Sequence, residues 1–226
     1  NLPVAIVLAR RDALRTLASN PEVRFFLAIL VAGCAAVVAL AWDGDRAAAL
    51  QGAIAVATGA GATTTPMLAP AGALVLILLA VTGGTIASPS GGITAYRALA
   101  LLRSIGRETR RLLHPKAVIP LRVGGRVIPE DAVLAIIAFF FTFVTAWIVG
   151  TGLLTVFEPG LALADAASGA LAAIANVAFG FGPFAAADGY AHLQTTSQIV
   201  LTALMWLGRL EVFAALLVFF PSTWRN

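Results

Sequence analysis

The sequence has few charged residues. Asp, Glu, Lys and Arg fill 12% of its 226 positions, whereas soluble globular domains carry about 25%. The hydrophobic share is 60%, and the mean hydropathy is +0.93. This composition excludes a soluble globular enzyme and a disordered chain, and it indicates a protein of the lipid bilayer.

Cysteine is almost absent as well. The single cysteine, Cys34, lies within an apolar run, so no disulfide can form inside the chain. We expect Cys34 to be a buried small side chain. One cysteine gives no information on the redox compartment, and it offers no cysteine-rich metal site.

Long uncharged runs are what the sequence does contain. Residues 25–42 and 132–157 are each long enough to cross the hydrocarbon core as a helix. Asn20-Pro21-Glu22 precedes the first run and is a helix-start signal. Residues 71–81 form a third apolar run, broken at Gly83-Gly84 and again across residues 88–92, and residues 197–221 form a fourth.

The basic residues gather in one connecting segment. Residues 97–126 contain seven arginines and Lys116, against the single acid Glu108. Such an excess places a loop on the cytoplasmic side, and residues 1–24 fall on the same side. We therefore expect a multi-pass protein of the plasma (inner) membrane with both ends of this chain cytoplasmic. Clustering of this kind argues against nucleic-acid binding.

Two alanine-rich stretches, residues 47–57 and 161–176, are too short to span, and a glycine-bearing segment follows each. The order of span, short helix, glycine segment and span thus occurs twice. A short helix that returns as extended backbone presents carbonyl oxygens to a cation, provided that protein or water covers it. Gly61 and Gly180 occupy that place in the two halves. The alternative is that both are helix C-caps.

We therefore predict an all-α membrane protein with two repeats, each made of a helix, a re-entrant pore helix with a filter loop, and a second helix, as in a potassium-channel-like pore. The first repeat comprises residues 1–115 and includes a cytoplasmic basic helix, and the second comprises residues 116–226. An enzyme is not expected. A serine hydrolase would need Ser88 or Ser90 to meet a histidine, but the charge pattern places His114 on the cytoplasmic side and His192 on the outer side.

Several runs resemble the Trk/Ktr/HKT family of potassium transporters. Residues 83–93, Gly-Gly-Thr-Ile-Ala-Ser-Pro-Ser-Gly-Gly-Ile, with Arg97 resemble that family's glycine-rich break in an inner helix. Leu207-Gly208-Arg209-Leu210-Glu211, followed by residues 220–225, resembles its C-terminal signature. His114-Pro115 and residues 20–24 match as well. The resemblance keeps its order and spacing over essentially the whole chain.

The resemblance implies a TrkH-type transmembrane subunit that takes up potassium. Proteins of this family hold four such repeats around a central pore, and this chain resembles the third and fourth, its C-terminal half. The implied filter residues are Thr58, Gly59, Ala60 and Gly61, and Asn176, Val177, Ala178, Phe179 and Gly180. The implied gate residues below the filter are Gly83, Gly84, Ser88, Pro89, Ser90, Gly91, Gly92 and Arg209.

The resemblance also implies partners. These are the lipid bilayer, the remaining pore repeats (before Asn1 or on a partner chain), a second copy in a homodimer, and a cytoplasmic regulatory ring of nucleotide-binding subunits. No cofactor is implied, and K⁺ is the cargo. Departures from the family pattern are Pro89 in the loop, Thr94 in place of a lysine, Ala62 in place of a phenylalanine and Ala178 in place of a glycine. They leave a divergent or transport-inactive paralogue, a scaffold, or a sodium-permeable member of the family as alternatives.

Arg209 is the most informative charge. An arginine near the bilayer centre is costly unless it faces a partner or water. We expect Arg209 to face the pore and to brace residues 88–92, the alternative being a bridge between packed helices. Glu211 lies two residues away on a different helix face, so the two side chains do not pair.

Overall fold

The computed structural model describes residues 20–40, 46–58, 70–85, 91–114, 119–177, 180–185 and 190–209. Among these residues the secondary structure is helical except for one small hairpin, as predicted for an all-α protein. The helices are α3 (Pro21–Leu40), α4 (Arg46–Thr58), α5 (Pro70–Thr82), α6 (Ala95–Leu113), α7 (Glu130–Phe157), α8 (Leu163–Ala175), the 3₁₀ helix η1 (Gly182–Ala185) and α9 (Thr195–Arg209).

Helices α3 and α7 are long and apolar enough to cross a membrane. They contain 20 and 28 residues, with mean hydropathies of 2.5 and 2.6 over their most apolar windows. Helix α3 begins as the sequence predicts, since the Asn20 side chain accepts a hydrogen bond of 3.0 Å from the Glu22 N–H. In α7, Glu130 and Asp131 occupy the first turn, where the helix dipole favours acids. Only 17% of the residues in each of these windows are buried, which suits contact with lipid.

The other two expected spans differ from α3 and α7. Helix α5 has 13 residues, about 20 Å of helix, and it ends at Thr82, immediately before the predicted break at Gly83-Gly84. The chain resumes as α6. Helix α9 is described as far as Arg209, and the rest of the apolar run 197–221 lies outside the described residues.

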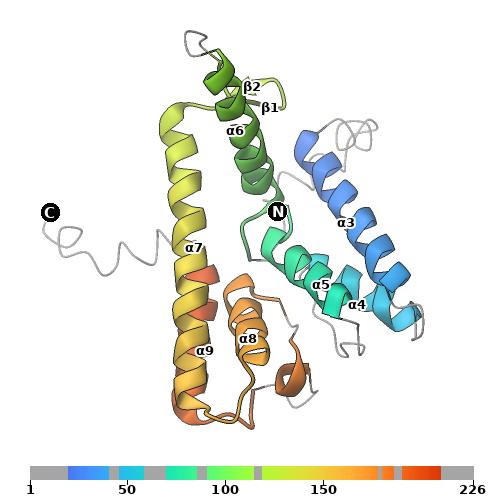
Figure 1. Cartoon of the computed structure of the whole chain (residues 1–226), viewed down its shortest axis with the longest axis vertical. Helices are drawn as coiled ribbons and strands as arrows, with labels where there is room; N and C mark the ends of the chain where they lie inside the picture. Colours follow the sequence, from blue (N-terminus) through green and yellow to red (C-terminus); the bar gives the residue numbers. More distant parts are fainter. Residues whose placement is uncertain are drawn as a thin grey trace, which may run out of the picture.

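The elements form two groups that lie side by side (Figure 1). Helices α3, α4 and α5 pack against one another, as do α7, α8 and α9, and contacts of α5 with α8 and of α6 with α7 join the groups. The short helices α4 and α8 both have 13 residues. Small residues allow close packing: Gly33 of α3 faces Leu79, and Gly150 of α7 faces Leu204.

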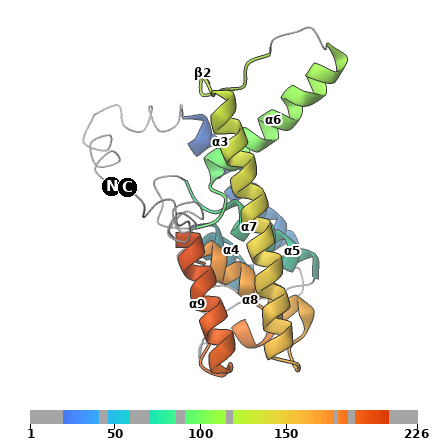
Figure 2. The same ribbon diagram turned by 90° about the vertical axis from the view of Figure 1, so that its left-hand side faces the viewer.

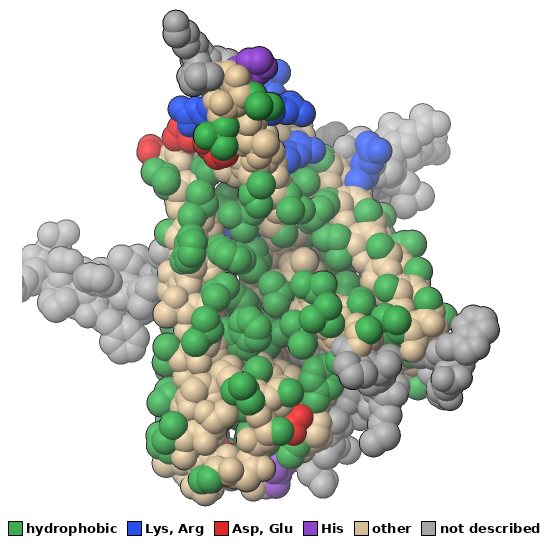
Figure 3. Space-filling model, viewed as in Figure 1, with side chains coloured by type: hydrophobic (Ala, Val, Ile, Leu, Met, Phe, Trp, Pro, Cys, Tyr) green, Lys and Arg blue, Asp and Glu red, His purple; other side chains and the backbone are tan. Residues whose placement is uncertain are grey.

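A hairpin lies at the end of the molecule that carries α6. Strands β1 (Arg122–Val123) and β2 (Arg126–Val127) pair antiparallel. Gly124 and Gly125 form the turn with φ of 63° and 79°, as a tight primed turn requires. Our sequence analysis did not predict this hairpin. Helix α6 projects away from the remaining helices (Figure 2). On the face in Figure 3, apolar side chains cover the middle while arginine side chains gather at this end.

Candidate ion pathway

Helix α8 is a buried helix of small residues. Nine of its 13 residues are buried. The Trp147 indole of α7 donates a hydrogen bond of 2.8 Å to the Ala167 carbonyl, and Gly169 leaves room for the Phe184 ring. Asp165 lies in the first turn, where the helix dipole favours an acid. Helix α8 is therefore both short and largely enclosed by protein.

The C-terminus of α8 ends in a left-handed cap at Asn176. Its φ and ψ are 52° and 42°. The Asn176 N–H donates to the Ala173 carbonyl at 3.2 Å and the Val177 N–H donates to the Ala172 carbonyl at 3.0 Å, the pair of bonds that defines a Schellman motif. Gly180 is therefore not the cap of α8, which removes the C-cap alternative for this glycine. Gly61 lies outside the described residues.

After Asn176 the chain turns back along α8. The Phe181 N–H donates to the Ser168 hydroxyl at 3.0 Å, and Gly182 lies against the Asp165 carboxylate. Asp165 and Ala175 are about 15 Å apart along the helix axis. Phe181 and Gly182 therefore lie beside the first half of α8, whereas Asn176 lies at its C-terminus.

Helix α9 crosses the C-terminus of α8 at Gly208. A Cβ on Gly208 would collide with the Ile174 carbonyl oxygen and would lie 2.8 Å from the Asn176 amide nitrogen. The Asn176 side chain donates to the Met205 carbonyl at 3.1 Å. The returning segment thus starts from a point that is fixed to α9 by a close approach and a hydrogen bond.

The break between α5 and α6 is built from glycines in left-handed conformations. Gly83 and Gly92 have φ of 61° and 88°, which a side chain would penalise. The Ile93 N–H donates to the Val81 carbonyl at 3.1 Å, and the Ala95 N–H donates to the Gly84 carbonyl at 2.9 Å. These bonds join the two ends of the loop.

The loop meets α8 at its C-terminus. A Cβ on Gly91 would lie 2.6 Å from the Ala175 carbonyl oxygen and 3.3 Å from the Asn176 Cβ. The described gate residue Gly91 and the start of the second predicted filter segment are therefore in contact, although Gly91 and Ala175 are 84 positions apart in the sequence.

The structure places four more of the predicted site residues, and the remaining ones lie outside the described residues. Thr58 is the last residue of α4, and its hydroxyl donates to the Ile54 carbonyl at 2.8 Å. Val177 and Gly180 are buried. Arg209 is exposed at the end of the described part of α9, beside Gly208. The predicted residues outside the described part of the chain are Gly59, Ala60, Gly61, Ser88, Pro89, Ser90, Ala178 and Phe179.

The sequence analysis did not identify Ser168 as a site residue, and it gave no structural role to Thr94. Ser168 holds the returning segment, and its only signal is a hydroxyl within an alanine-rich helix. Thr94, noted as a departure from the family pattern, has φ of 64°. Its hydroxyl is buried, and the structure gives it no hydrogen-bond partner among the described residues. Backbone strain of this kind occurs mainly at functional sites.

The family profile TrkH, described as Cation transport protein, matches residues 14–225. The chain is 33% identical over 178 residues to the Trk system potassium uptake protein TrkH of Salmonella typhimurium, covering 76% of this chain and 35% of that protein. It is 30% identical over 217 residues to the protein of the same name from Halomonas elongata, covering 92% of this chain and 44% of that protein.

The fold matches a solved structure. The crystal structure of the potassium transporter TrkH from Vibrio parahaemolyticus superposes with a TM-score of 0.81 at 28% sequence identity, covering 95% of this chain and 47% of that one. The chain thus spans less than half the length of these relatives. Its helical fold and the match over nearly all of its sequence show that the chain belongs to the TrkH family of cation transport proteins.

Proposed function

We propose that the chain forms part of the pore of a membrane protein that takes up potassium. The observation that carries the proposal is the meeting of three backbone segments, at Gly91, Asn176 and Gly208, around the C-terminus of a buried short helix. A cation that loses its hydration shell needs carbonyl oxygens held at fixed positions. The names of the Salmonella and Halomonas relatives, which are potassium uptake proteins, support potassium as the ion.

In this proposal the carbonyl groups of Asn176, Val177, Ala178, Phe179 and Gly180 form one side of the selectivity filter. The segment Thr58 to Gly61 forms a second side. The loop from Gly83 to Gly92 and Arg209 form the gate. The contact of Gly91 with the end of α8 supports a gate directly next to the filter.

The proposal extends to the assembly. Residues 1–115 and 116–226 are the third and fourth of four repeats, and the other repeats come from a longer chain or from a partner. The whole protein is a homodimer, is regulated by a cytoplasmic nucleotide-binding ring, acts as no enzyme and needs no cofactor. The arginine-rich end of the molecule with α6 faces the cytoplasm, which agrees with the positive-inside rule.

Rubidium uptake tests the function. A bacterial host without its own potassium uptake systems, expressing the full natural protein, is expected to accumulate rubidium and to grow at low external potassium. Competition by potassium but not by sodium would identify the selective ion. Membrane insertion without uptake would contradict the proposal and would favour the scaffold alternative, whereas equal competition by sodium would favour the sodium-permeable alternative.

Arg209→Ala is expected to change the rate of rubidium uptake while leaving membrane insertion intact. The reason is that a charge at this depth is retained for a role in the pathway, and Arg209 follows the contact of Gly208 with α8. The matched control is Arg126→Ala, since Arg126 is an exposed arginine on the hairpin. Unchanged uptake in Arg209→Ala would exclude Arg209 from the gate.

A further inference from the structure

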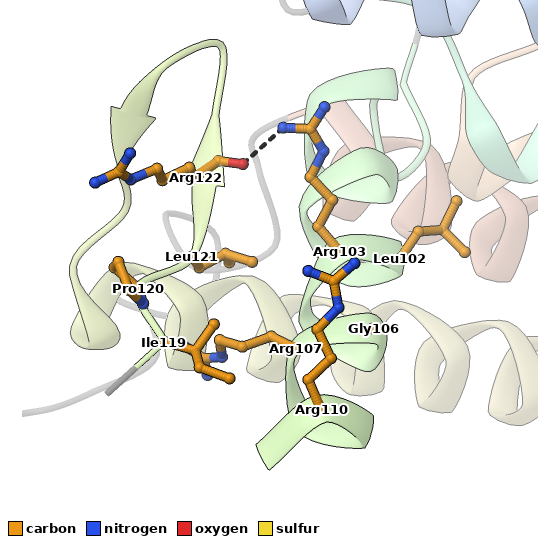
Figure 4. A pocket seen from close by; sticks show the side chains of 9 residues that line it. All are labelled: Leu102, Arg103, Gly106, Arg107, Arg110, Ile119, Pro120, Leu121 and Arg122. Carbon is orange, nitrogen blue, oxygen red and sulfur yellow. Dashed lines mark hydrogen bonds between the residues drawn. The ribbon is translucent and has the colours of Figure 1, made fainter. Parts of the chain in front are cut away.

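An arginine-lined cavity of about 450 Å³ lies between α6 and the segment that leads into β1. Its lining residues are Leu102, Arg103, Gly106, Arg107, Arg110, Ile119, Pro120, Leu121 and Arg122. Four of these nine are arginines, and no acidic residue belongs to the described lining. Figure 4 shows Arg103 and Arg110 on the same side of α6, with Arg107 extending toward Ile119. The cavity is a concentrated positive site.

The charge of Arg107 is neutralised by Glu108 and Glu130, so this arginine lines the cavity in a fixed position. Its side chain is 7% exposed. It donates to Glu130 at 2.7 and 3.2 Å and to Glu108 at 3.0 Å. Burial alone lowers the pKa of the Arg107 guanidinium, but the hydrogen bonds to Glu130 and Glu108 outweigh that effect, so its pKa lies above the ordinary value. This ion pair ties α6 to the start of α7.

Arg103 and Arg110 retain donors for a ligand. Arg103 uses one N–H in a hydrogen bond of 2.6 Å to the Arg122 carbonyl. Arg110 has no hydrogen bond or ion pair with another side chain in the part of the chain that the structure describes. A guanidinium group presents five N–H donors in a planar fork, which matches the oxygens of a phosphate. The two side chains project from one face of α6, seven residues apart.

Exposed apolar residues lie on α6 beside the cavity, and one of them, Leu102, also belongs to its lining. They are Leu102, Ile105, Leu112 and Leu113, which are 56%, 65%, 84% and 72% accessible. Gly106 belongs to the lining as well, and a Cβ there would meet no atom within 4 Å. A helix with a basic face and an exposed apolar face is typical of the membrane interface.

We propose that this cavity binds the phosphate group of an anionic phospholipid, with Arg103 and Arg110 as the phosphate ligands. The acyl chains of the lipid lie along the apolar face of α6 at Leu102 and Ile105. A free phosphate would use the arginines but not that apolar face, so the exposed leucines favour the lipid. Basic pockets beside membrane helices hold anionic headgroups by the same means. The inference requires a membrane but does not depend on which ion the protein carries.

Lipid binding to the full natural protein in detergent tests the proposal. Native mass spectrometry with short-chain phosphatidylglycerol measures affinity, with phosphatidylcholine as the zwitterionic comparison. Arg103→Gln and Arg110→Gln are each expected to weaken phosphatidylglycerol binding about fivefold, on the basis of about 1 kcal/mol for each basic residue near anionic lipid. The matched control is Arg111→Gln, because Arg111 lies on the same helix outside the lining and pairs with Glu108 at 3.6 Å. This control is expected to bind normally.

A second variant fills the arginine-lined cavity without changing any charge. Gly106→Leu places a side chain into the open cavity without a backbone collision, so it is expected to abolish specific phosphatidylglycerol binding while the thermal unfolding temperature is unchanged. Thr109→Leu, an exposed position on the same helix, controls for added apolar surface. Equal weakening by Arg111→Gln, normal binding by Gly106→Leu, or equal binding of phosphatidylcholine would overturn the proposal. Displacement of the lipid by millimolar inorganic phosphate would identify a soluble phosphate site instead.

Discussion

Gly208→Ala is expected to destabilise the protein and to abolish ion uptake. The Cβ of an alanine would occupy the position of the Ile174 carbonyl oxygen, so α9 must move away from the C-terminus of α8. The obstacle is backbone rather than the end of a flexible side chain. We expect a loss of about 3 kcal/mol, the upper end for overpacked interiors, which corresponds to a fall of roughly 6–12 °C in Tm.

The same movement explains the expected loss of function. Asn176 donates to the Met205 carbonyl of α9, and this bond breaks when α9 moves. Asn176 begins the returning segment, so its carbonyl groups lose their fixed positions. Thermal unfolding of the purified full protein and rubidium uptake in a transport-deficient host measure the two effects.

Gly152→Ala is the matched control for Gly208→Ala. Gly152 also lies inside a helix, but a Cβ there would meet nothing within 4 Å. Alanine in a helix interior is favoured over glycine by about 0.5–1 kcal/mol, so this variant is expected to be as stable as the natural protein or slightly more so. If Gly208→Ala and Gly152→Ala had equal Tm values and equal uptake, close contact at Gly208 would not be needed for the fold.

Local features of the sequence predicted the helices. Residues 25–42 and 132–157 are apolar over a length sufficient for a spanning helix, and Asn20 lies at a helix start that forms as predicted. Gly83 ends α5 because its φ of 61° suits glycine. Each of these signals lies within a few residues of the helix end or span that it determines. A single sequence was therefore sufficient to predict these helices.

Contacts between distant residues were not predictable in this way. Gly91 meets Ala175 and Gly208 meets Ile174, yet nothing in the composition around these residues identifies the partner. The resemblance to a family identified Gly91, Asn176 and the signature that contains Gly208 as site residues. It did not indicate which residues contact one another. The hairpin was missed because its strands have two residues each, too short for an alternating pattern to appear.

The ion pair between the buried Arg107 and the exposed Glu130 was not predictable from the sequence either. The sequence analysis treated Arg107 as one of many cations that orient the chain in the membrane. Its partner lies 23 residues away, beyond the hairpin, and a sequence shows no reason why Arg107 rather than Arg103 should be buried. The count of arginines predicts the side of the membrane, whereas the fold decides which arginine is neutralised.

Gly91→Ala is expected to lower rubidium uptake several-fold with a smaller effect on stability than Gly208→Ala. A Cβ on Gly91 would lie 2.6 Å from the Ala175 carbonyl oxygen and 2.9 Å from its carbon, so the loop or the end of α8 must shift by about 1 Å to restore ordinary contact. We expect Gly91 rather than α8 to shift, because nine of the 13 residues of α8 are buried. The global fold is therefore expected to persist.

Uptake still falls, because the shifted loop lies at the end of the proposed filter. If the loop instead pushes Ala175 and Asn176 aside, potassium loses its advantage over sodium, since the carbonyl positions set the discrimination. The measurement is rubidium uptake by the full protein with and without competing sodium. Gly160→Ala is the control: Gly160 lies in the turn after α7, and a Cβ there would meet nothing within 4 Å. Natural uptake rates and natural selectivity in Gly91→Ala would mean that the glycine-rich loop does not govern the ion pathway at this contact.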